Sequence, residues 1–155
     1  MPSTTIRPQV VRIASAFAAA AAGPALVGCG LIPGLQNDVF RLEVGDCLAD
    51  RLSDGEITEA ATVECTQPHF GEVFAGTMLQ DGEYPGDAEV SSTAEEECLA
   101  EFESFVGTAY ADSELDIHML YPSKETWESL NDREILCIAF DPAGDTTGSL
   151  SGASR

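Results

Sequence analysis

The cysteines constrain the fold of this chain more than any other feature of its sequence. Four of the five lie well beyond the N-terminal segment: Cys47, Cys65, Cys98 and Cys137. No two of them form a C-x-x-C pair, and the two histidines do not supply the partner spacing of a zinc finger, so we expect no metal site. An even set of cysteines is typical of two disulfides in an exported domain. The next question is therefore whether the sequence directs export.

The N-terminal segment has the charge and hydropathy pattern of a signal peptide. Its charged residues are Arg7 and Arg12, and all 27 acidic residues lie at or after Asp38. The apolar run Ile13–Val27 has the length of a signal-peptide hydrophobic region and is shorter than the roughly 20 residues that a membrane-spanning helix needs. Pro24 also argues against a continuous transmembrane helix. The segment predicts export.

The apolar run ends in Leu26-Val27-Gly28-Cys29, which resembles the lipobox of bacterial lipoproteins. Small residues suit the peptidase cleft, and a thiol at this position can carry a thioether-linked diacylglycerol. We expect residues 1–28 to be a lipoprotein signal peptide, and residues 29–38 to be the lipidated Cys29 with a tether to the outer face of the cytoplasmic membrane. Acyl chains such as palmitate would anchor it at about 0.8 kcal/mol per buried methylene. The alternative is a conventional signal peptide cleaved nearby, with Cys29 incidental.

The net charge argues against two classes of partner. The formal net charge is -20, and loss of Arg7 and Arg12 with the signal peptide would make it -22. We expect no nucleic-acid partner, because neutralisation of phosphates supplies much of the affinity for DNA or RNA. The net negative charge also argues against a domain that a basic patch holds on anionic lipid. The hydrophobic fraction of 44% still allows a globular core.

Residues 39–143 are expected to form one α+β domain. Alternating or continuous apolar residues predict five strands, at Val39–Val44, Ala61–Thr66, Glu72–Leu79, Leu115–Met119 and Ile135–Phe140. The last strand is apolar throughout, so it should be central and buried on both faces. The apolar stripe of Asp87–Val106 predicts one long helix that ends at Gly107, and a short helix should follow at Ser123–Leu130.

The sum of these elements is a small, mainly antiparallel sheet with one long helix packed across it. Residues 144–155 are rich in Gly, Ser and Thr, and we expect them to be a flexible tail without core-forming residues. Four cysteines allow three disulfide pairings. We favour Cys47 with Cys65, on consecutive strands, and Cys98 with Cys137, which would join the long helix to the last strand. Each closure should contribute about 3–4 kcal/mol.

No catalytic or metal-binding motif is complete. Gly148-Ser149-Leu150-Ser151-Gly152 has the outline of a nucleophile elbow, but a leucine stands where the serine is required. The alternating acids of residues 112–116 have the outline of a calcium loop, but Ile117 stands where glycine is required. We therefore expect a protein that is not an enzyme and has no cofactor.

Three residues are candidates for binding. His69 lies in a turn near Cys65 and could be a ligand, although a histidine that hydrogen-bonds within its own turn is the more common arrangement. Trp127 and Arg133 could form a cation–π pair at a binding surface. The structural alternative is a packed tryptophan beneath a contact made by Asp132 and Arg133.

Several motifs combine along the chain: Phe40-x-Leu42-x-Val44-Gly45-Asp46-Cys47, Val63-x-Cys65-x-x-Pro68-His69, Glu72-Val73-Phe74, Tyr84-Pro85-Gly86, a helical Cys98, Pro122 ahead of Trp127, Asp132-Arg133-x-x-x-Cys137 and Gly148-Ser149-Leu150. Together they resemble the septum formation-related domain of exported and membrane-anchored actinobacterial proteins. One departure is the segment Glu128-Ser129-Leu130-Asn131, which lacks the glycine expected next to Asp132.

The resemblance implies a non-catalytic envelope module with a role near cell division. Together with the lipobox, it suggests a lipoprotein on the extracytoplasmic face of the membrane, serving as a binding or scaffold module in envelope and septum formation. Its partners would be the membrane, through the lipid on Cys29, and an envelope or division protein. The alternatives are an envelope enzyme or accessory protein acting on wall polymers, and a cation- or ligand-binding lipoprotein.

Overall fold

The computed structural model describes residues 38–53 and 57–155. The expected signal peptide at residues 1–28, Cys29 and the tether up to residue 37 lie outside the described residues. Lipidation of Cys29 therefore stays a prediction from sequence.

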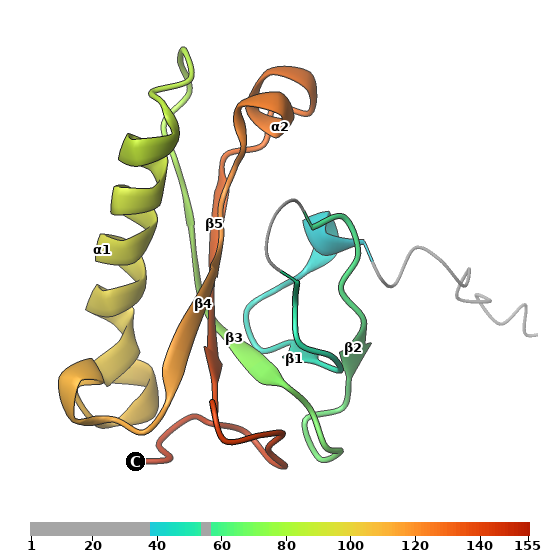
Figure 1. The fold of residues 1–155 in the computed structure, drawn as a ribbon, viewed down its shortest axis with the longest axis vertical. Helices are drawn as coiled ribbons and strands as arrows, with labels where there is room; N and C mark the ends of the chain where they lie inside the picture. The colour runs from blue at the N-terminus through green and yellow to red at the C-terminus, as the bar shows by residue number, and fades with distance from the viewer. Residues whose placement is uncertain (1–37, 54–56) are drawn as a thin grey trace, which may run out of the picture. The chain divides into compact units, whose positions relative to one another are not determined.

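A five-stranded antiparallel sheet forms the centre of the domain (Figure 1). Its strands are β1 (Cys47–Leu48), β2 (Thr62–Val63), β3 (Gly71–Met78), β4 (Asp116–Leu120) and β5 (Glu134–Phe140), in the order β2-β1-β3-β5-β4. The long strands β3 and β5 pair along their whole length, and six of the seven residues of β5 are buried. The predicted α+β class is thus confirmed, and the last strand lies inside the sheet, between β3 and β4, as predicted.

The long helix α1 (Asp87–Val106) covers one face of the sheet, as predicted (Figure 1). Every fourth residue is buried: Val90, Ala94, Cys98, Phe102 and Val106. The last four of these side chains pack with Phe74, Ile135 and other residues of β3 and β5 into one hydrophobic cluster. Gly107 ends the helix in the left-handed conformation (φ 85°), which glycine adopts without steric cost.

The opposite face is covered by the segment that leads into β1. Leu42, Leu48 and Ala60 pack there on Val73 and Ile138 in a second hydrophobic cluster. The sheet is therefore enclosed on both faces, which explains why β5 carries apolar side chains at successive positions.

The strand expected at Val39–Val44 is wrong. Its first residues form a short 3-10 helix, η1 (Val39–Arg41), and the remainder is not in a strand. The two side chains that reach the core, Val39 and Leu42, are three residues apart, which fits a helix with three residues per turn. A strand with Phe40, Leu42 and Val44 on one buried face would bury Phe40, which is instead 44% exposed.

Both favoured disulfides are present. Cys47 of β1 is bonded to Cys65, which follows β2, and Cys98 of α1 is bonded to Cys137 of β5. The second disulfide joins the helix to the central strand inside the buried core. The first joins β1 to the residue two positions after β2. These two strands have two residues each and can form few backbone hydrogen bonds with each other.

A short helix, α2 (Lys124–Ser129), follows β4 as predicted. Ser123 caps it reciprocally: its hydroxyl accepts from the N–H of Thr126 at 3.1 Å, and its own N–H donates to the hydroxyl of Thr126 at 3.0 Å. Beyond the helix Asn131 has a φ of 56°. Asparagine tolerates this left-handed conformation better than most residues, so it replaces the glycine that the resemblance led us to expect.

The C-terminal segment 144–155 is packed on the domain, and the expectation that it holds no core-forming residue is wrong. Leu150 is 3% exposed and belongs to the cluster beneath α1. The backbone of Thr146 pairs with that of His69, and Gly148 donates its N–H to the carbonyl of Cys65 at 2.6 Å. At the end of the chain, the guanidinium of Arg155 bonds Asp141 at 2.6 Å. The Gly- and Ser-rich composition of the segment conceals these contacts, because the apolar ones are made by Leu150 and the small side chain of Ala153.

Candidate functional site

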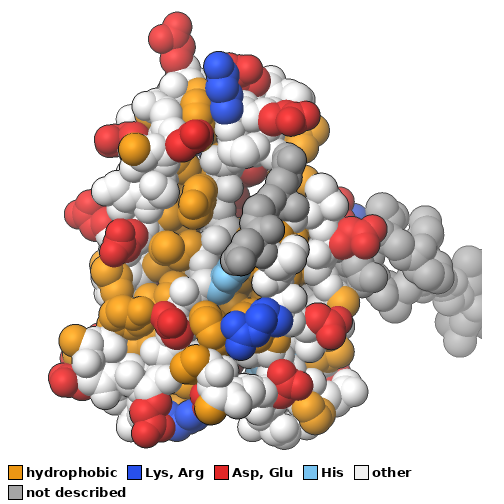
Figure 2. Space-filling view, in the orientation of Figure 1, with side chains coloured by type: hydrophobic (Ala, Val, Ile, Leu, Met, Phe, Trp, Pro, Cys, Tyr) orange, Lys and Arg blue, Asp and Glu red, His pale blue; other side chains and the backbone are white. Residues whose placement is uncertain are grey.

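A groove of about 900 Å³ lies where the end of β4, the start of α2 and the first turns of α1 come together. Tyr121 and Pro122 form part of its wall, and Phe40 of η1 lies on another side. Tyr121 and Phe40 are each 44% exposed. On the face shown in Figure 2, hydrophobic side chains gather beside α1, and acidic side chains surround them. The groove thus combines accessible aromatic surface with carboxylates.

Carboxylates dominate the charge of the groove. Its described lining includes Asp87, Glu125, Asp132 and Glu134, against one ammonium group, that of Lys124. Burial raises the pKa of Glu134 above its ordinary value, and the nearby negative charge of Asp132 adds to the effect. A negative charge at Glu134 is therefore poorly solvated, and a bound cation would stabilise it.

Tyr84 fixes the side of the groove formed by the start of α1. Its hydroxyl donates to the carboxylate of Asp87 at 2.6 Å. Burial, followed by this hydrogen bond, raises the pKa of Tyr84 to about 12. The phenol therefore stays protonated at physiological pH and holds its ring edge-on against Trp127, with ring centroids 5.6 Å apart.

Trp127 and Arg133 form a buried contact behind the groove. The guanidinium carbon of Arg133 lies 3.7 Å from the centroid of the Trp127 ring, and the two residues are 7% and 5% exposed. The guanidinium also donates to the carbonyls of Trp127 and Asp132 at 3.1 and 2.7 Å, and its Nε lies 3.4 Å from a carboxylate oxygen of Asp81. The indole N–H donates to the carbonyl of Gly82 at 3.0 Å. This arrangement is a packed tryptophan beneath a structural arginine, and it supports the wall that carries Tyr84.

His69 is fully buried and does not line the groove. Its Nδ1 lies 2.8 Å from the carbonyl of Gln67, within its own turn, and its Nε2 lies 3.3 Å from the hydroxyl of Thr146. Both ring nitrogens are therefore engaged: Nδ1 within the turn before β3, and Nε2 with the C-terminal segment. The histidine serves the fold, and the structure does not bring it together with Trp127 or Arg133.

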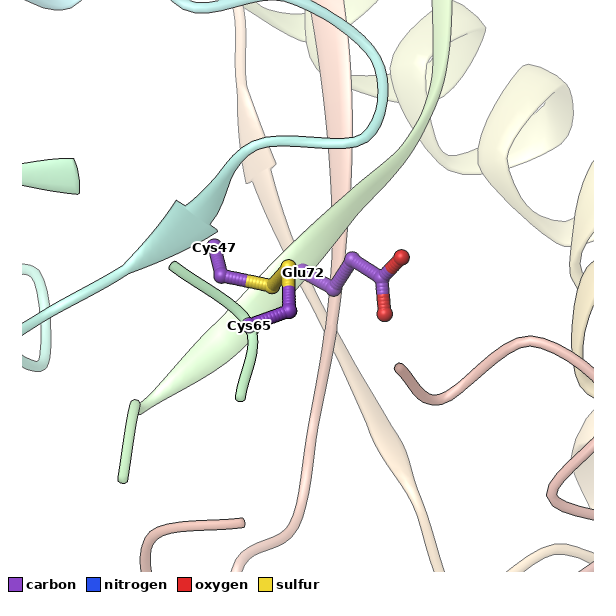
Figure 3. A group of neighbouring side chains, drawn as sticks. All are labelled: Cys47, Cys65 and Glu72. Carbon is purple, nitrogen blue, oxygen red and sulfur yellow. A yellow bond between two sulfur atoms is a disulfide. The ribbon is translucent and has the colours of Figure 1, made fainter. Parts of the chain in front are cut away.

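Glu72 lies close to the disulfide between Cys47 and Cys65, and the three side chains resemble a metal site in their spacing alone (Figure 3). The two sulfur atoms are bonded to each other, so neither is a thiolate ligand. The carboxylate of Glu72 points away from them (Figure 3) and accepts from the hydroxyl of Ser149 at 2.9 Å and the N–H of Leu150 at 2.7 Å. The buried carboxylate thus holds the C-terminal segment in place.

Reasoning from sequence missed the groove. Tyr121, Asp87 and Glu134 come from three separate elements, and no spacing along the chain links them. The pair Tyr121-Pro122, which follows the predicted strand Leu115–Met119, was the one local signal, because the residue before a proline tends to lie at an element boundary.

A family model described as septum formation matches residues 44–153. Membrane proteins described as uncharacterized, from two strains of Mycobacterium tuberculosis, are each 32% identical to this chain over 112 residues. The matched region covers 66% of this chain and 24% of each relative, so the chain spans about a quarter of the length of these curated relatives. No solved structure matches. Within residues 38–53 and 57–155, no helix is both long enough and apolar enough to cross a bilayer.

Proposed function

This chain belongs to the septum formation family, and from that premise we propose that it is a lipid-anchored, non-catalytic binding or scaffold module on the extracytoplasmic face of the cytoplasmic membrane. It would act in building the cell envelope and the septum. The family description supports a role in septum formation, and the description of the relatives as membrane proteins supports a membrane location.

The two disulfides are the observation that carries the extracytoplasmic location. Cys47–Cys65 and Cys98–Cys137 use all four cysteines of the domain, and disulfides persist in oxidising compartments. The sequence Leu26-Val27-Gly28-Cys29 supplies the means of retention after export. A formal charge of -20 would keep the domain off anionic headgroups, so its surface would remain available to a partner.

The arrangement of polar groups favours binding over catalysis. His69 and Glu72 are buried side chains that could serve in catalysis, but their hydrogen bonds hold the turn before β3 and the C-terminal segment. The accessible groups are the aromatic rings and carboxylates of the groove. Such a surface recognises a partner through shape and charge.

The proposal is tested by following the full-length protein in dividing cells. Arg155 packs on the domain, so a small epitope should be attached behind a flexible linker. We expect enrichment at the division site, which Cys29→Ala should abolish. An even signal over the whole envelope would contradict the septal role.

Metabolic labelling with an alkyne fatty acid tests the anchor separately. The wild-type protein should incorporate the label, and Cys29→Ala should not. The matched control is Cys65→Ser, which removes a thiol of the disulfide set and should keep the label. Incorporation by Cys29→Ala would contradict lipidation at this residue.

A further inference from the structure

The outer edge of β4 runs along the groove. The groove is lined by four successive residues, from His118 to Tyr121. Because successive side chains of a strand point to opposite faces of the sheet, a hollow that touches all four lies along the edge of the strand. Among the described residues β4 is the last strand of the sheet, with β5 on its other side.

The backbone of β4 offers hydrogen-bonding groups at this edge. The N–H of Ile117 is directed away from β5, because it donates to the carboxylate of Asp116 at 2.8 Å. Met119, two residues further on, presents its backbone to the same side. Asp116 thus covers the first position of the edge, and the positions from Met119 onward adjoin the groove.

The side chains around this edge favour a partner segment with cationic residues. Glu134 and Asp132 lie on one side, Asp87 lies on another, and the exposed ring of Tyr121 is at the end of the strand. Lysine and arginine side chains can pair with carboxylates and stack on aromatic rings. An added strand of alternating cationic and apolar residues would place its cations near these carboxylates and the ring of Tyr121. Its apolar side chains would lie over Met119.

We propose that the edge of β4 accepts an extended, lysine- or arginine-containing segment of a partner protein as an added strand, with its side chains in the groove. This inference rests on the proposed function and names the partner chemistry of that module. Main-chain hydrogen bonds would supply affinity, and the carboxylates would supply selectivity.

The test is a binding titration with the capped peptide Lys-Val-Lys-Val-Lys-Val-Lys. The full-length chain is purified in a neutral detergent with its disulfides intact, and the peptide is added to it. Trp127 is the one tryptophan of the chain and packs on Tyr84 beside the groove, so its fluorescence reports binding. A second peptide has the same sequence with alternate backbone nitrogens methylated. It keeps the charge but cannot pair with a strand edge, and we expect it to bind about tenfold more weakly.

Two variants test the two parts of the site. Glu134→Gln should weaken binding by about threefold to tenfold, because it removes one poorly solvated carboxylate. The matched control is Glu96→Gln, which removes an equal charge from the exposed face of α1 and should leave affinity unchanged. Met119→Pro should weaken binding by about tenfold, because proline removes the backbone N–H at the edge and edge strands tolerate proline. Tyr121→Ala leaves the backbone unchanged and removes the exposed aromatic side chain of the groove, and it should also weaken binding.

Equal binding of the two peptides, or equal effects of Glu134→Gln and Glu96→Gln, would overturn the proposal in favour of general attraction to an acidic surface. Absence of binding would overturn it as well. The localisation experiment fails separately: septal enrichment without peptide binding would remove strand addition and keep the proposed function. Peptide binding without septal enrichment would remove the proposed septal role and keep strand addition.

Discussion

Replacement of Leu150 by alanine should lower the free energy of unfolding by about 2–3 kcal/mol. Leu150 is 3% exposed and packs in the cluster beneath α1. Buried Leu→Ala substitutions cost about 2–5 kcal/mol, depending on how far the surroundings close over the cavity. We expect the lower part of that range because Leu150 lies in a segment without helix or strand, whose backbone can shift partly into the cavity. Complete collapse is opposed by Gly152 and Ser154, which donate their N–H groups to carbonyls of Phe105 and Val106, each at 2.8 Å.

Urea unfolding followed by circular dichroism, with the disulfides intact, measures this change. The midpoint should fall while the dependence on urea concentration stays constant, and the melting temperature should fall by roughly 10 °C. Leu130→Ala is the matched control, since Leu130 is 59% exposed, and it should change stability by less than about 0.5 kcal/mol. Similar small losses in both variants would refute the conclusion that the C-terminal segment completes the core.

Three further predictions concern charge and cross-links. The hydrogen bond from Arg155 lowers the pKa of Asp141, so this pair stabilises the fold at neutral pH, and its contribution is lost as the pH falls through the lowered pKa. Arg155→Ala should therefore cost about 0.5–1 kcal/mol at pH 7 and progressively less in acid, as measured by urea unfolding at several pH values. Burial, with a contribution from the charge of Asp132, raises the pKa of Glu134. Glu134→Gln should therefore slightly raise the melting temperature at pH 7. The gain should shrink as the pH falls, because the native carboxyl then protonates. Replacement of both Cys98 and Cys137 by serine should cost about 4 kcal/mol by loop closure, measured by denaturant unfolding, and a loss below 1 kcal/mol would contradict a stabilising cross-link.

Regular elements with strong periodicity could be predicted from the sequence. From Val90 to Val106 an apolar residue recurs every four positions. This spacing predicts α1, because one face of the helix must be apolar to pack on the sheet. The unbroken apolar run of β5 predicts a strand covered on both faces. Once these two elements were placed, Cys98 and Cys137 had a short route to each other, which is why the pairing could be favoured.

Irregular segments could not be predicted in the same way. Residues 39–44 alternate as a strand would, but burial at Val39 and Leu42 is satisfied by one 3-10 turn. Leu150 stands among small polar residues, and its burial depends on contacts with elements distant in sequence. The groove depends on such contacts entirely, since the start of α1, the end of β4 and the start of α2 meet only in the folded chain.

The C-terminal segment also makes folding of the domain depend on contacts between distant parts of the chain. The carboxylate of Glu72 accepts from the N–H of Leu150, 78 residues later, and His69 pairs with Thr146, so the first long strand is secured by residues that are synthesised well after it. A nascent chain lacks these contacts until residues 146–150 have been made. Under the proposed export, the shorter chain would stay open while it engages a channel that accepts unfolded polypeptide. Folding would then follow translocation, and the disulfides would close in the compartment where these contacts form.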